Sequence, residues 1–359
     1  MVREVLITIL VLIFAPGVFA PGVFAQSGRN KPAETPSPTP KRLGGYSPTE
    51  KTIPIANPKP TPPKIDDDKD VIKVESNLVP IPASVLDARG QTVGGLKLED
   101  FLLQIDGNPV EIGDFSRSET PVRLVVLFDN SSSVTIAREF EKKAAVRFFR
   151  RVIRPEKDLV GLFSVATVSR LEQPLTKDVS LLVQSIENFA QPAGATALLD
   201  GIIEAANYLR DAQGRRVIVI VSDGDDTVSD ATFDATLKSL QLANCQVYIV
   251  KTTDFENSIR TGQRTGSANL RQLAAERRMQ EIAGQTGGAV YSPIDEDELD
   301  RAFNQISAEL AQQYILSYYP ENEADKRGEF RTISLSVKTR QNLSVRTRKG
   351  YYVPKQVNR

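Results

Sequence analysis

Oxygen-bearing side chains follow two apolar runs of this sequence, at positions where they could bind a metal ion. Asp129, Ser131 and Ser133 come directly after the run 123–128, and Asp223 comes shortly after a second run of the same character. Apolar runs of this kind predict strands that are buried on both faces of a parallel sheet. Open α/β sheets place their ligand sites at the carboxyl ends of such strands, so we expect these side chains to meet at one edge.

A third segment is expected to bring another hydroxyl to the same edge. Thr196 lies in the small-residue stretch 194–198, between the two strands, and is expected to open a helix. Any one of these oxygen-bearing residues could simply cap a helix, but one cap does not need three hydroxyls and an acid from a distant strand. Two carboxylates and three hydroxyls from three loops are the oxygen ligands that a hard divalent cation prefers. The set therefore predicts a divalent metal site.

This pattern resembles the metal-ion-dependent adhesion site of the von Willebrand factor A domain. The resemblance implies a metal-binding role for the five signature positions, which are Asp129, Ser131, Ser133, Thr196 and Asp223. It also implies that one or both acids act through water, so that the ion keeps a net positive charge and one open coordination position. In the family, an Asp or Glu of a partner protein fills that position. Mg²⁺ fits such a partly hydrated six-oxygen shell, and Mn²⁺ or Ca²⁺ could replace it.

The segments around this domain carry a less specific resemblance. The Tyr-x-Leu-x-Tyr pattern at 314–318, together with a short β segment before the A domain, is similar to the von Willebrand factor A-related exported proteins of acidobacteria. This resemblance extends over nearly the whole chain after the first 70 residues. It implies a protein-binding module with an adhesion or scaffold role.

The composition excludes several classes of function. The 359 residues contain no histidine, which excludes Ser-His-Asp and Cys-His catalysis and zinc sites built on imidazole. Cys245 is the single cysteine, so the chain forms no internal disulfide. Lys and Arg together number 45, as do Asp and Glu, and a zero net charge gives no general attraction to nucleic acid. We therefore expect no enzyme, no catalytic residues and no nucleic-acid partner, and the oligomeric state stays open.

The first 25 residues have the pattern of a cleavable signal peptide. Arg3 precedes the apolar stretch 5–14, and Val23-Phe24-Ala25 offers small residues for cleavage. The apolar stretch is too short to cross a bilayer, so we expect a mature chain without a membrane span. The sequence thus predicts a secreted or periplasmic protein.

Residues 26–66 predict a disordered, proline-rich linker. This stretch holds ten of the 22 prolines, with Ser, Thr, Lys and Gly between them. Such a composition buries too little apolar surface to offset the entropy of the chain.

Three further segments follow, with different hydrophobic periods. Residues 67–118 alternate as short strands, residues 119–312 alternate strand and helix, and residues 313–359 return to a period of two. The middle segment predicts the α/β class, with a doubly wound, mostly parallel sheet. Each outer segment has too few strands to close a core, so we expect the two to pair in a small antiparallel β-sandwich around the A domain. The Gly-, Thr-, Ser- and Arg-rich residues 252–268 predict a loop near the metal edge.

Two other functions stay open. A phosphatase of the haloacid-dehalogenase type also has an apolar strand that ends in a nucleophilic Asp, here Asp129, and a later acidic loop, here 222–226. It needs a second Asp as general acid at the position of Ser131, and a serine cannot transfer protons near neutral pH. The other alternative is a metal-free A domain that serves as a scaffold.

Asp225 and Asp226 extend the acidic loop and are expected to be solvated.

Overall fold

The computed structural model describes six stretches of the chain, which are residues 78–117, 120–132, 138–262, 270–320, 327–340 and 342–353. All of them fall within one compact unit, Ile72–Arg359. The predicted signal peptide at 1–25 and the predicted linker at 26–66 lie outside the described residues, as does Ser133.

A six-stranded sheet forms the centre of the α/β part, with the strand order β10-β9-β8-β5-β6-β7. Its strands are β5 (Val122–Asp129), β6 (Leu159–Val165), β7 (Ser169–Thr176), β8 (Arg215–Ser222), β9 (Cys245–Lys251) and β10 (Val290–Tyr291). All of them run parallel except β7, which pairs antiparallel with β6 at one side of the sheet. β5, β8 and β9 are buried along nearly their whole length, as apolar strands covered on both faces must be.

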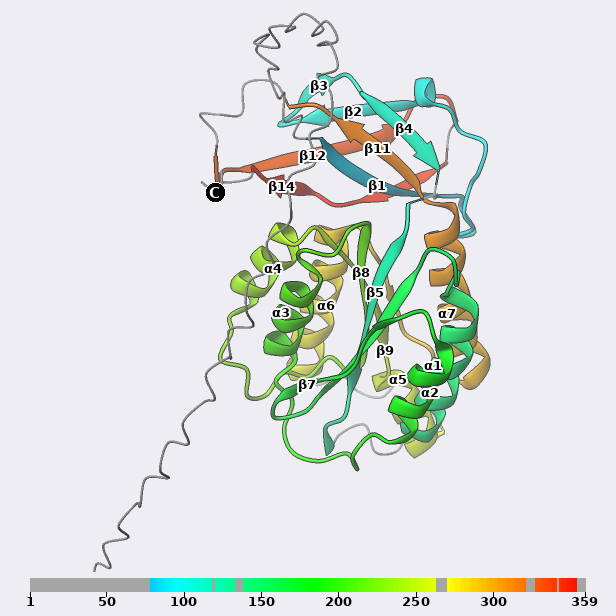
Figure 1. The fold of residues 1–359 in the computed structure, drawn as a ribbon, viewed down its shortest axis with the longest axis vertical. Helices are drawn as coiled ribbons and strands as arrows, with labels where there is room; N and C mark the ends of the chain where they lie inside the picture. The colour runs from blue at the N-terminus through cyan, green and yellow to red at the C-terminus, as the bar shows by residue number, and fades with distance from the viewer. Residues whose placement is uncertain are drawn as a thin grey trace, which may run out of the picture. The chain divides into compact units, whose positions relative to one another are not determined.

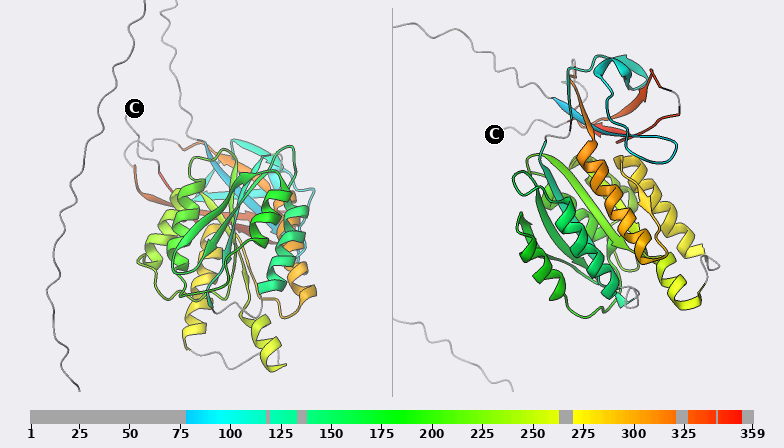
Figure 2. Two further views of the ribbon diagram at one scale, coloured as in Figure 1. Left: turned by 60° about the horizontal axis from the view of Figure 1, so that its bottom comes forward. Right: turned by 90° about the vertical axis from the view of Figure 1, so that its right-hand side faces the viewer.

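Helices cover both faces of this sheet (Figure 1). They are α1 (Arg138–Val152), α2 (Val179–Glu187), α3 (Leu198–Leu209), α4 (Phe233–Leu242), α5 (Thr253–Thr261), α6 (Leu270–Thr286) and α7 (Glu296–Gln312). One apolar core lies between the sheet and α1, α2 and α7, and a second lies between the sheet and α3, α4 and α6. Figure 2 shows these layers from two other directions.

Aromatic packing fixes α1 against α7. The rings of Phe148 on α1 and Phe303 on α7 are buried and stack with their centroids 4.7 Å apart. Such a pair contributes about 0.5 to 1.5 kcal/mol beyond the burial of its surface. Asp295 caps α7 by accepting a hydrogen bond from the backbone N of Glu298 at 2.7 Å. Because α1 begins shortly after Asp129, this packing also holds the element that follows the candidate metal site.

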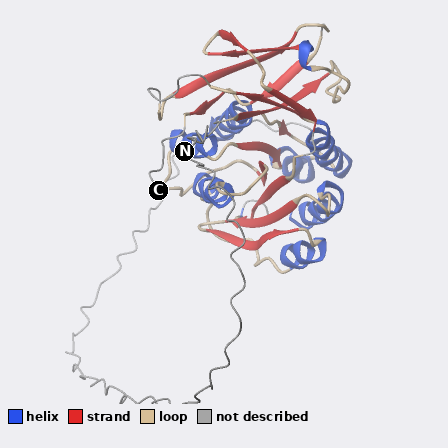
Figure 3. Cartoon of the chain, turned by 45° about the horizontal axis from the view of Figure 1, so that its top comes forward, coloured by secondary structure: helices blue, strands red, loops and turns tan. Residues whose placement is uncertain are grey.

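The remaining strands form two four-stranded antiparallel sheets, β13-β1-β11-β4 and β14-β12-β2-β3 (Figure 3). Their strands are β1 (Val79–Leu86), β2 (Phe101–Ile105), β3 (Asn108–Val110), β4 (Asp114–Arg117), β11 (Tyr314–Tyr318), β12 (Phe330–Val337), β13 (Ser344–Thr347) and β14 (Gly350–Tyr352). A short 3-10 helix, Leu98–Asp100, precedes β2. Strands from the two ends of the unit alternate in the first sheet, where β1 pairs with β11 and β13. In the second sheet, the N-terminal hairpin β2-β3 joins the C-terminal pair β12-β14 through β2 and β12.

The two antiparallel sheets share one apolar core. Ile81 on β1, Leu103 on β2 and Leu316 on β11 are almost fully buried and belong to it. The architecture confirms the predicted fold class, a doubly wound, mostly parallel sheet with a small antiparallel β-sandwich. None of the helices in the described stretches is long and apolar enough to span a bilayer.

Buried polar side chains join the sandwich to the α/β part where α7 ends. Gln313 is fully buried and donates to Ser84 Oγ of β1 at 3.2 Å and to Gln246 Oε1 of β9 at 3.0 Å. Its own Oε1 accepts from Arg215 Nη1 at 2.9 Å. Each polar atom of this amide therefore has a partner, as burial requires.

Glu309 on α7 makes a second junction of this kind. Its buried carboxylate accepts from Tyr248 OH at 3.2 Å and from Tyr291 OH at 2.9 Å, and it pairs with Arg346 of β13. Burial, and then the charge of Glu309, raise the pKa of Tyr248 well above its usual value. Since a buried carboxylate without partners costs several kcal/mol, these contacts bind the sandwich to the sheet.

The sequence prediction is wrong in the stretch 252–268, part of which is a helix. α5 carries Asp254 and Glu256 in its first turn and ends at Gly262, which has a φ of +69°. Early acids and a left-handed glycine after the last turn are helix-end signals. The Gly, Thr, Ser and Arg content of the whole stretch obscured them, and residues 263–269 lie outside the described part.

Candidate metal centre

Asp129, the last residue of β5, is held by hydrogen bonds on both carboxylate oxygens. Oδ1 accepts from the backbone N of Ser131 at 2.9 Å, and Oδ2 accepts from Ser222 Oγ at 2.6 Å. Ser222 is the last residue of β8, which pairs in parallel with β5. Asp129 and Ser131 are each 1 % exposed. The strand pairing therefore holds this carboxylate against the loop that contains Asp223.

The loop after β5 is tied to the loop before α3. Asn130 O accepts from Ala193 N at 3.1 Å, and Ser132 N donates to Gly194 O at 3.3 Å. Gly194 has a φ of +79°, and a Cβ there would lie 2.5 Å from the hydroxyl oxygen of Thr167. The position thus requires glycine, because any side chain would be strained and would clash.

Arg138, the first residue of α1, braces the same loop. Its buried guanidinium donates to Asn130 Oδ1 and to the backbone carbonyls of Phe189 and Ala190. Burial lowers the pKa of Arg138 from its usual value, because its partners are neutral oxygens. These bonds connect α1 to the segment that leads to Thr196.

Thr196 is held from the other side by the loop after β8. Its backbone N donates to Thr227 Oγ1 at 2.9 Å, and its carbonyl accepts from Thr227 N at 2.8 Å. Asp226 Oδ1 accepts from the backbone N of Leu198 at 2.9 Å and of Leu199 at 3.2 Å. Asp226 therefore caps α3, whose first turn directly follows Thr196.

Asp223 leads the third loop. Its Oδ1 accepts from Asp225 N at 2.9 Å, and its backbone carbonyl accepts from Thr253 Oγ1 of α5 at 3.0 Å. Gly224 has a φ of +83°, which allows the chain to turn directly after the carboxylate. Asp223 is half-buried, whereas Asp129 is buried.

The two acids repel each other across this site. Burial, and then the charge of Asp223, raise the pKa of Asp129 to about 6. The hydrogen bonds from Ser222 and Ser131 oppose the shift but do not cancel it. Among the described residues, no Lys or Arg forms an ion pair with Asp129. A bound cation would supply the missing positive charge.

A third acid, Glu141 on α1, lies buried close to these two. Its exposed fraction is 1 %. Neither of its carboxylate oxygens accepts a hydrogen bond from the described residues. Burial, and then the charges of Asp129 and Glu256, raise its pKa well above the usual value. Burial and the neighbouring negative charges therefore favour the neutral form of Glu141.

The donor set of this edge suits a hard divalent cation. Two carboxylates and neutral hydroxyls are the oxygen ligands that Mg²⁺ accepts together with water. Among the described residues, no three Asp, Glu or Cys side chains are grouped as metal ligands. An ion here would therefore depend on hydroxyl and water oxygens for most of its shell.

Four of the five predicted ligands come from three loops that are hydrogen-bonded to one another at this edge, namely Asp129, Ser131, Thr196 and Asp223. The fifth, Ser133, lies outside the described residues. Sequence reasoning missed Ser222, although a hydroxyl at the end of the neighbouring parallel strand is a usable signal. It also missed Glu141, since nothing in a helical sequence tells a buried acid from a solvated one.

The expectation for the acidic loop needs correction. Asp226 is not simply solvated but caps α3, and Asp225 pairs with Arg271 of α6 at 3.1 Å. Both roles depend on elements that are distant in sequence.

Comparison with known proteins supports part of this picture. Residues 124–225 match the family model of the von Willebrand factor type A domain. No curated protein resembles the chain closely enough to count as a relative.

Several solved structures are similar to this chain at low sequence identity. An aerotolerance-related membrane protein from Bacteroides fragilis is 21% identical, with 53% of this chain and 98% of that chain covered and a TM-score of 0.41. A von Willebrand factor type A protein from Catenulispora acidiphila is 11% identical, with 79% and 76% covered and a TM-score of 0.44. The von Willebrand domain of a type V pili tip protein from Porphyromonas gingivalis is 14% identical, with 52% and 94% covered and a TM-score of 0.40. These likenesses are too distant to carry an inference about function.

The matched stretch begins in β5 and ends in the acidic loop after β8, so it contains Asp129, Thr196 and Asp223. The family match and the observed sheet together support a von Willebrand factor type A domain in this part of the chain.

Proposed function

We propose that this protein is an exported, non-enzymatic binding module that captures a partner protein through a divalent ion. The ion, Mg²⁺ or in its place Mn²⁺ or Ca²⁺, is held by Asp129, Ser131, Ser133, Thr196 and Asp223. The observation that carries the proposal is the buried Asp129 carboxylate, which lies close to a second acid and pairs with no Lys or Arg among the described residues. Such a charge is stabilised when a ligand supplies its counter-charge.

The kind of partner follows from the ligand chemistry. Serine and threonine hydroxyls are neutral, and Asp223 is half-buried and open to water. An ion at this site has no more than two negatively charged ligands from the protein. Water fills the rest of its shell and can be exchanged. An Asp or Glu side chain of a partner protein is the natural replacement for such a water.

The arrangement gives little support to a phosphatase. Ser131 stands where the general acid would be, and a serine hydroxyl does not transfer protons near neutral pH. With no histidine in the chain, a proton donor near neutral pH would have to be a shifted acid, and Glu141 is buried without contact to solvent. A metal-free scaffold remains the alternative that a metal titration decides.

Export is the second part of the proposal. The signal-peptide pattern of residues 1–25 supports a secreted or periplasmic location, with residues 26–66 as a spacer before the folded unit. We divide the rest into a β segment at 67–118, the A domain at 119–312 and β strands at 313–359 that pair with the first segment. A partner would then be met outside the cytoplasm.

The test uses Mn²⁺ as a paramagnetic probe. Bound Mn²⁺ that keeps an exchangeable water should enhance the relaxation of water protons. Acetate should displace that water and reduce the enhancement. Chloride at equal ionic strength is the control and should leave the enhancement unchanged. Thr196→Val removes one hydroxyl ligand without loss of volume and should weaken Mn²⁺ binding by about tenfold. Thr92→Val removes a hydroxyl in the sandwich, far from the site, and is the control. Mn²⁺ binding without any response to acetate would contradict carboxylate capture, and no Mn²⁺ binding at all would favour the scaffold.

A further inference from the structure

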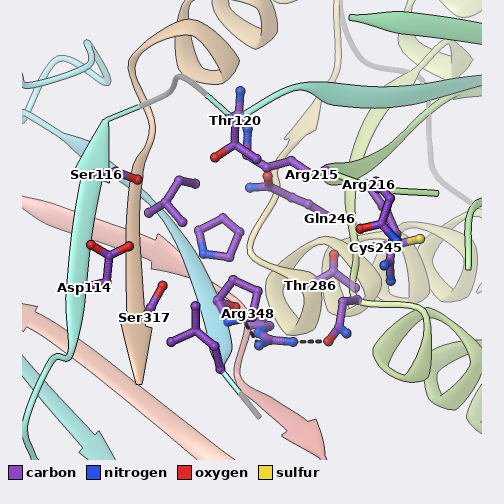
Figure 4. Close-up of a pocket in the computed structure, with 17 residues that line it drawn as sticks. Asp114, Ser116, Thr120, Arg215, Arg216, Cys245, Gln246, Thr286, Ser317 and Arg348 are labelled. Carbon is purple, nitrogen blue, oxygen red and sulfur yellow. Dashed lines mark hydrogen bonds between the residues drawn. The ribbon is translucent and has the colours of Figure 1, made fainter. Parts of the chain in front are cut away.

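A cavity of about 380 Å³ lies at the amino edge of the parallel sheet, at the opposite ends of the strands from Asp129. Residues at the starts of β8 and β9 line one side of it, and residues of β1, β4 and β11 line the other (Figure 4). Its size is that of a small-molecule site. The cavity thus lies between the α/β part and the sandwich.

Three arginines line this cavity. Arg215 and Arg216 open β8, and Arg348 lies between β13 and β14 of the sandwich. Arg215 and Arg348 are 6 % and 9 % exposed, whereas Arg216 is half-buried. Three arginines from two parts of the fold are therefore gathered around one cavity.

The acceptors of these arginines are all neutral. Arg348 donates to Asn244 Oδ1 and to the carbonyl of Pro80, and Arg216 donates to the carbonyls of Ala212 and Ala243. Arg215 donates to the amide of Gln313 and to a carbonyl at the end of α7. In the described part of the chain, none of the three forms an ion pair with an acid.

Donor groups are left over on these side chains. The Nε atoms of Arg215 and Arg348 are buried and donate to no acceptor among the described residues. Burial lowers the pKa of both to about 10, and the charge of Arg216 adds to the shift at Arg348. Buried positive charges that lack a counter-charge cost free energy, which an anion in the cavity would offset.

The opposite wall is mixed, with apolar residues, two serines (Ser116 and Ser317) and one acid. Pro80, Pro82 and Ile315 line it together with Asp114, which among the described lining residues is the one carboxylate. Figure 4 shows Asp114 on the sandwich side of the cavity, away from Arg215. Asp114 is exposed and makes no ion pair with the arginines, so it does not neutralise them.

We propose that this cavity binds a small organic anion. Its carboxylate or phosphate group would pair with Arg216 and Arg348, since guanidinium groups bind such oxyanions through paired N–H donors. Its apolar part would lie against Pro80, Pro82 and Ile315. The ligand would contact the sheet and the sandwich together, and it would thereby stabilise their junction. This site is separate from the metal centre and does not depend on the proposed function.

The test is calorimetric titration of the full chain, freed of metal on a chelating resin, with two probes. Phenyl phosphate and benzoate carry the same ring with different oxyanions, and each is compared with chloride at equal ionic strength. One saturable site is expected, and the tighter probe identifies the oxyanion class. Arg216→Gln should weaken binding by about tenfold or more, because it removes a charged hydrogen-bond donor.

Two further variants keep the test decisive if Arg216→Gln folds poorly. Asp114→Asn removes the negative charge from the opposite wall and should tighten binding by about two- to fivefold. Arg151→Gln removes an exposed arginine of α1 outside the cavity and should change nothing. The proposal is overturned if neither probe binds at about 10 mM, where even a millimolar site would be filled. It is also overturned if binding is the same in the wild type and in the Arg216→Gln and Asp114→Asn variants.

Discussion

At the carboxyl edge of the parallel sheet, Asp129 and Asp223 lie close together, whereas at the amino edge Arg215, Arg216 and Arg348 line one cavity. Strand β8 joins the two edges, which lie about 23 Å apart at the usual rise of a strand. Burial raises the pKa of Asp129 to about 6 and lowers the pKa of Arg215 to about 10, so both groups are pushed toward their neutral forms. In each place like charges gather, and among the described residues neither Asp129 nor any of the three arginines forms an ion pair.

The difference between the edges lies in where their residues come from. The acidic edge is built by three loops of the α/β part, which follow β5, precede α3 and follow β8. The basic edge also needs the sandwich, because Arg348 and Pro80 come from its strands. The acidic edge should therefore respond to changes within the α/β part, and the basic edge to changes at the junction with the sandwich.

The largest effect on stability is expected at the basic edge. Arg215→Ala leaves the buried Gln313 amide and the carbonyl of Leu310 without their donor. The free energy of unfolding should fall by about 2 to 5 kcal/mol, because losing a charged donor to two buried acceptors is costly. Urea unfolding should give the same loss with and without Mg²⁺. Arg151→Ala, an exposed arginine on α1, is the control, and an equally small change for both variants would contradict the role of Arg215.

The acidic edge should make the metal-free protein sensitive to pH. The pKa of Asp129 is about 6 in the folded chain against a usual 3.8, so the folded state binds more protons between these values. This contribution is present below about pH 4 and is lost as the pH rises through 6, at a cost of about 1 to 3 kcal/mol. Other acids follow their own trends, so the quantity to measure is the difference between wild type and Asp129→Asn. A difference that does not vary between pH 4 and 7 would argue against the raised pKa.

A smaller effect is expected from the cap that holds the Thr196 loop. Asp226→Ala removes the acceptor for the backbone N of Leu198 and Leu199. Thermal unfolding should show a loss of about 1 kcal/mol, which is typical of a lost N-cap. Asp226→Asn keeps a side-chain oxygen that can accept these bonds, so it should lower the free energy of unfolding by only about a few tenths of a kcal/mol. If both variants behave alike, the charge of Asp226 matters rather than its cap.

The smallest effect is expected at the rim of the acidic edge. Arg271 pairs with Asp225 at 3.1 Å, but its side chain is 59% exposed. Arg271→Ala should change the free energy of unfolding by less than about 1 kcal/mol and the Mg²⁺ affinity by less than about threefold. A larger change in affinity alone would mean that Asp225 takes part in binding the ion.

The sheet and the sandwich were predictable because their signals are local. Apolar runs such as Leu124–Phe128 and alternating runs such as Ile333–Val337 show directly which faces are buried. α5 was missed because its own cap signals, Asp254 and Gly262, lie within a stretch of loop-like composition. Short helices depend on packing more than on propensity, so composition misleads there.

The two edges of the sheet also differ in how far their sites can be predicted from the sequence. Asp129 and Asp223 each follow a recognisable buried strand, so their convergence can be predicted from the topology of parallel sheets. Arg215, Arg216 and Arg348 are unremarkable in sequence, and their common cavity exists only because the sandwich packs against the sheet. The same holds for Glu141, whose burial depends on elements that are distant in the chain.

The central claim is that a divalent ion binds at Asp129, and calorimetric titration with Mg²⁺ tests it most directly. The account predicts one bound ion in the wild type, with a gain in unfolding free energy of about 2.7 kcal/mol at a hundredfold excess over Kd. Asp129→Asn should bind at least about a hundredfold more weakly, since it removes a direct ligand. Asp178→Asn, a change of the same kind at the exposed cap of α2, should bind as the wild type does. Equal heats for wild type and Asp129→Asn would contradict the claim.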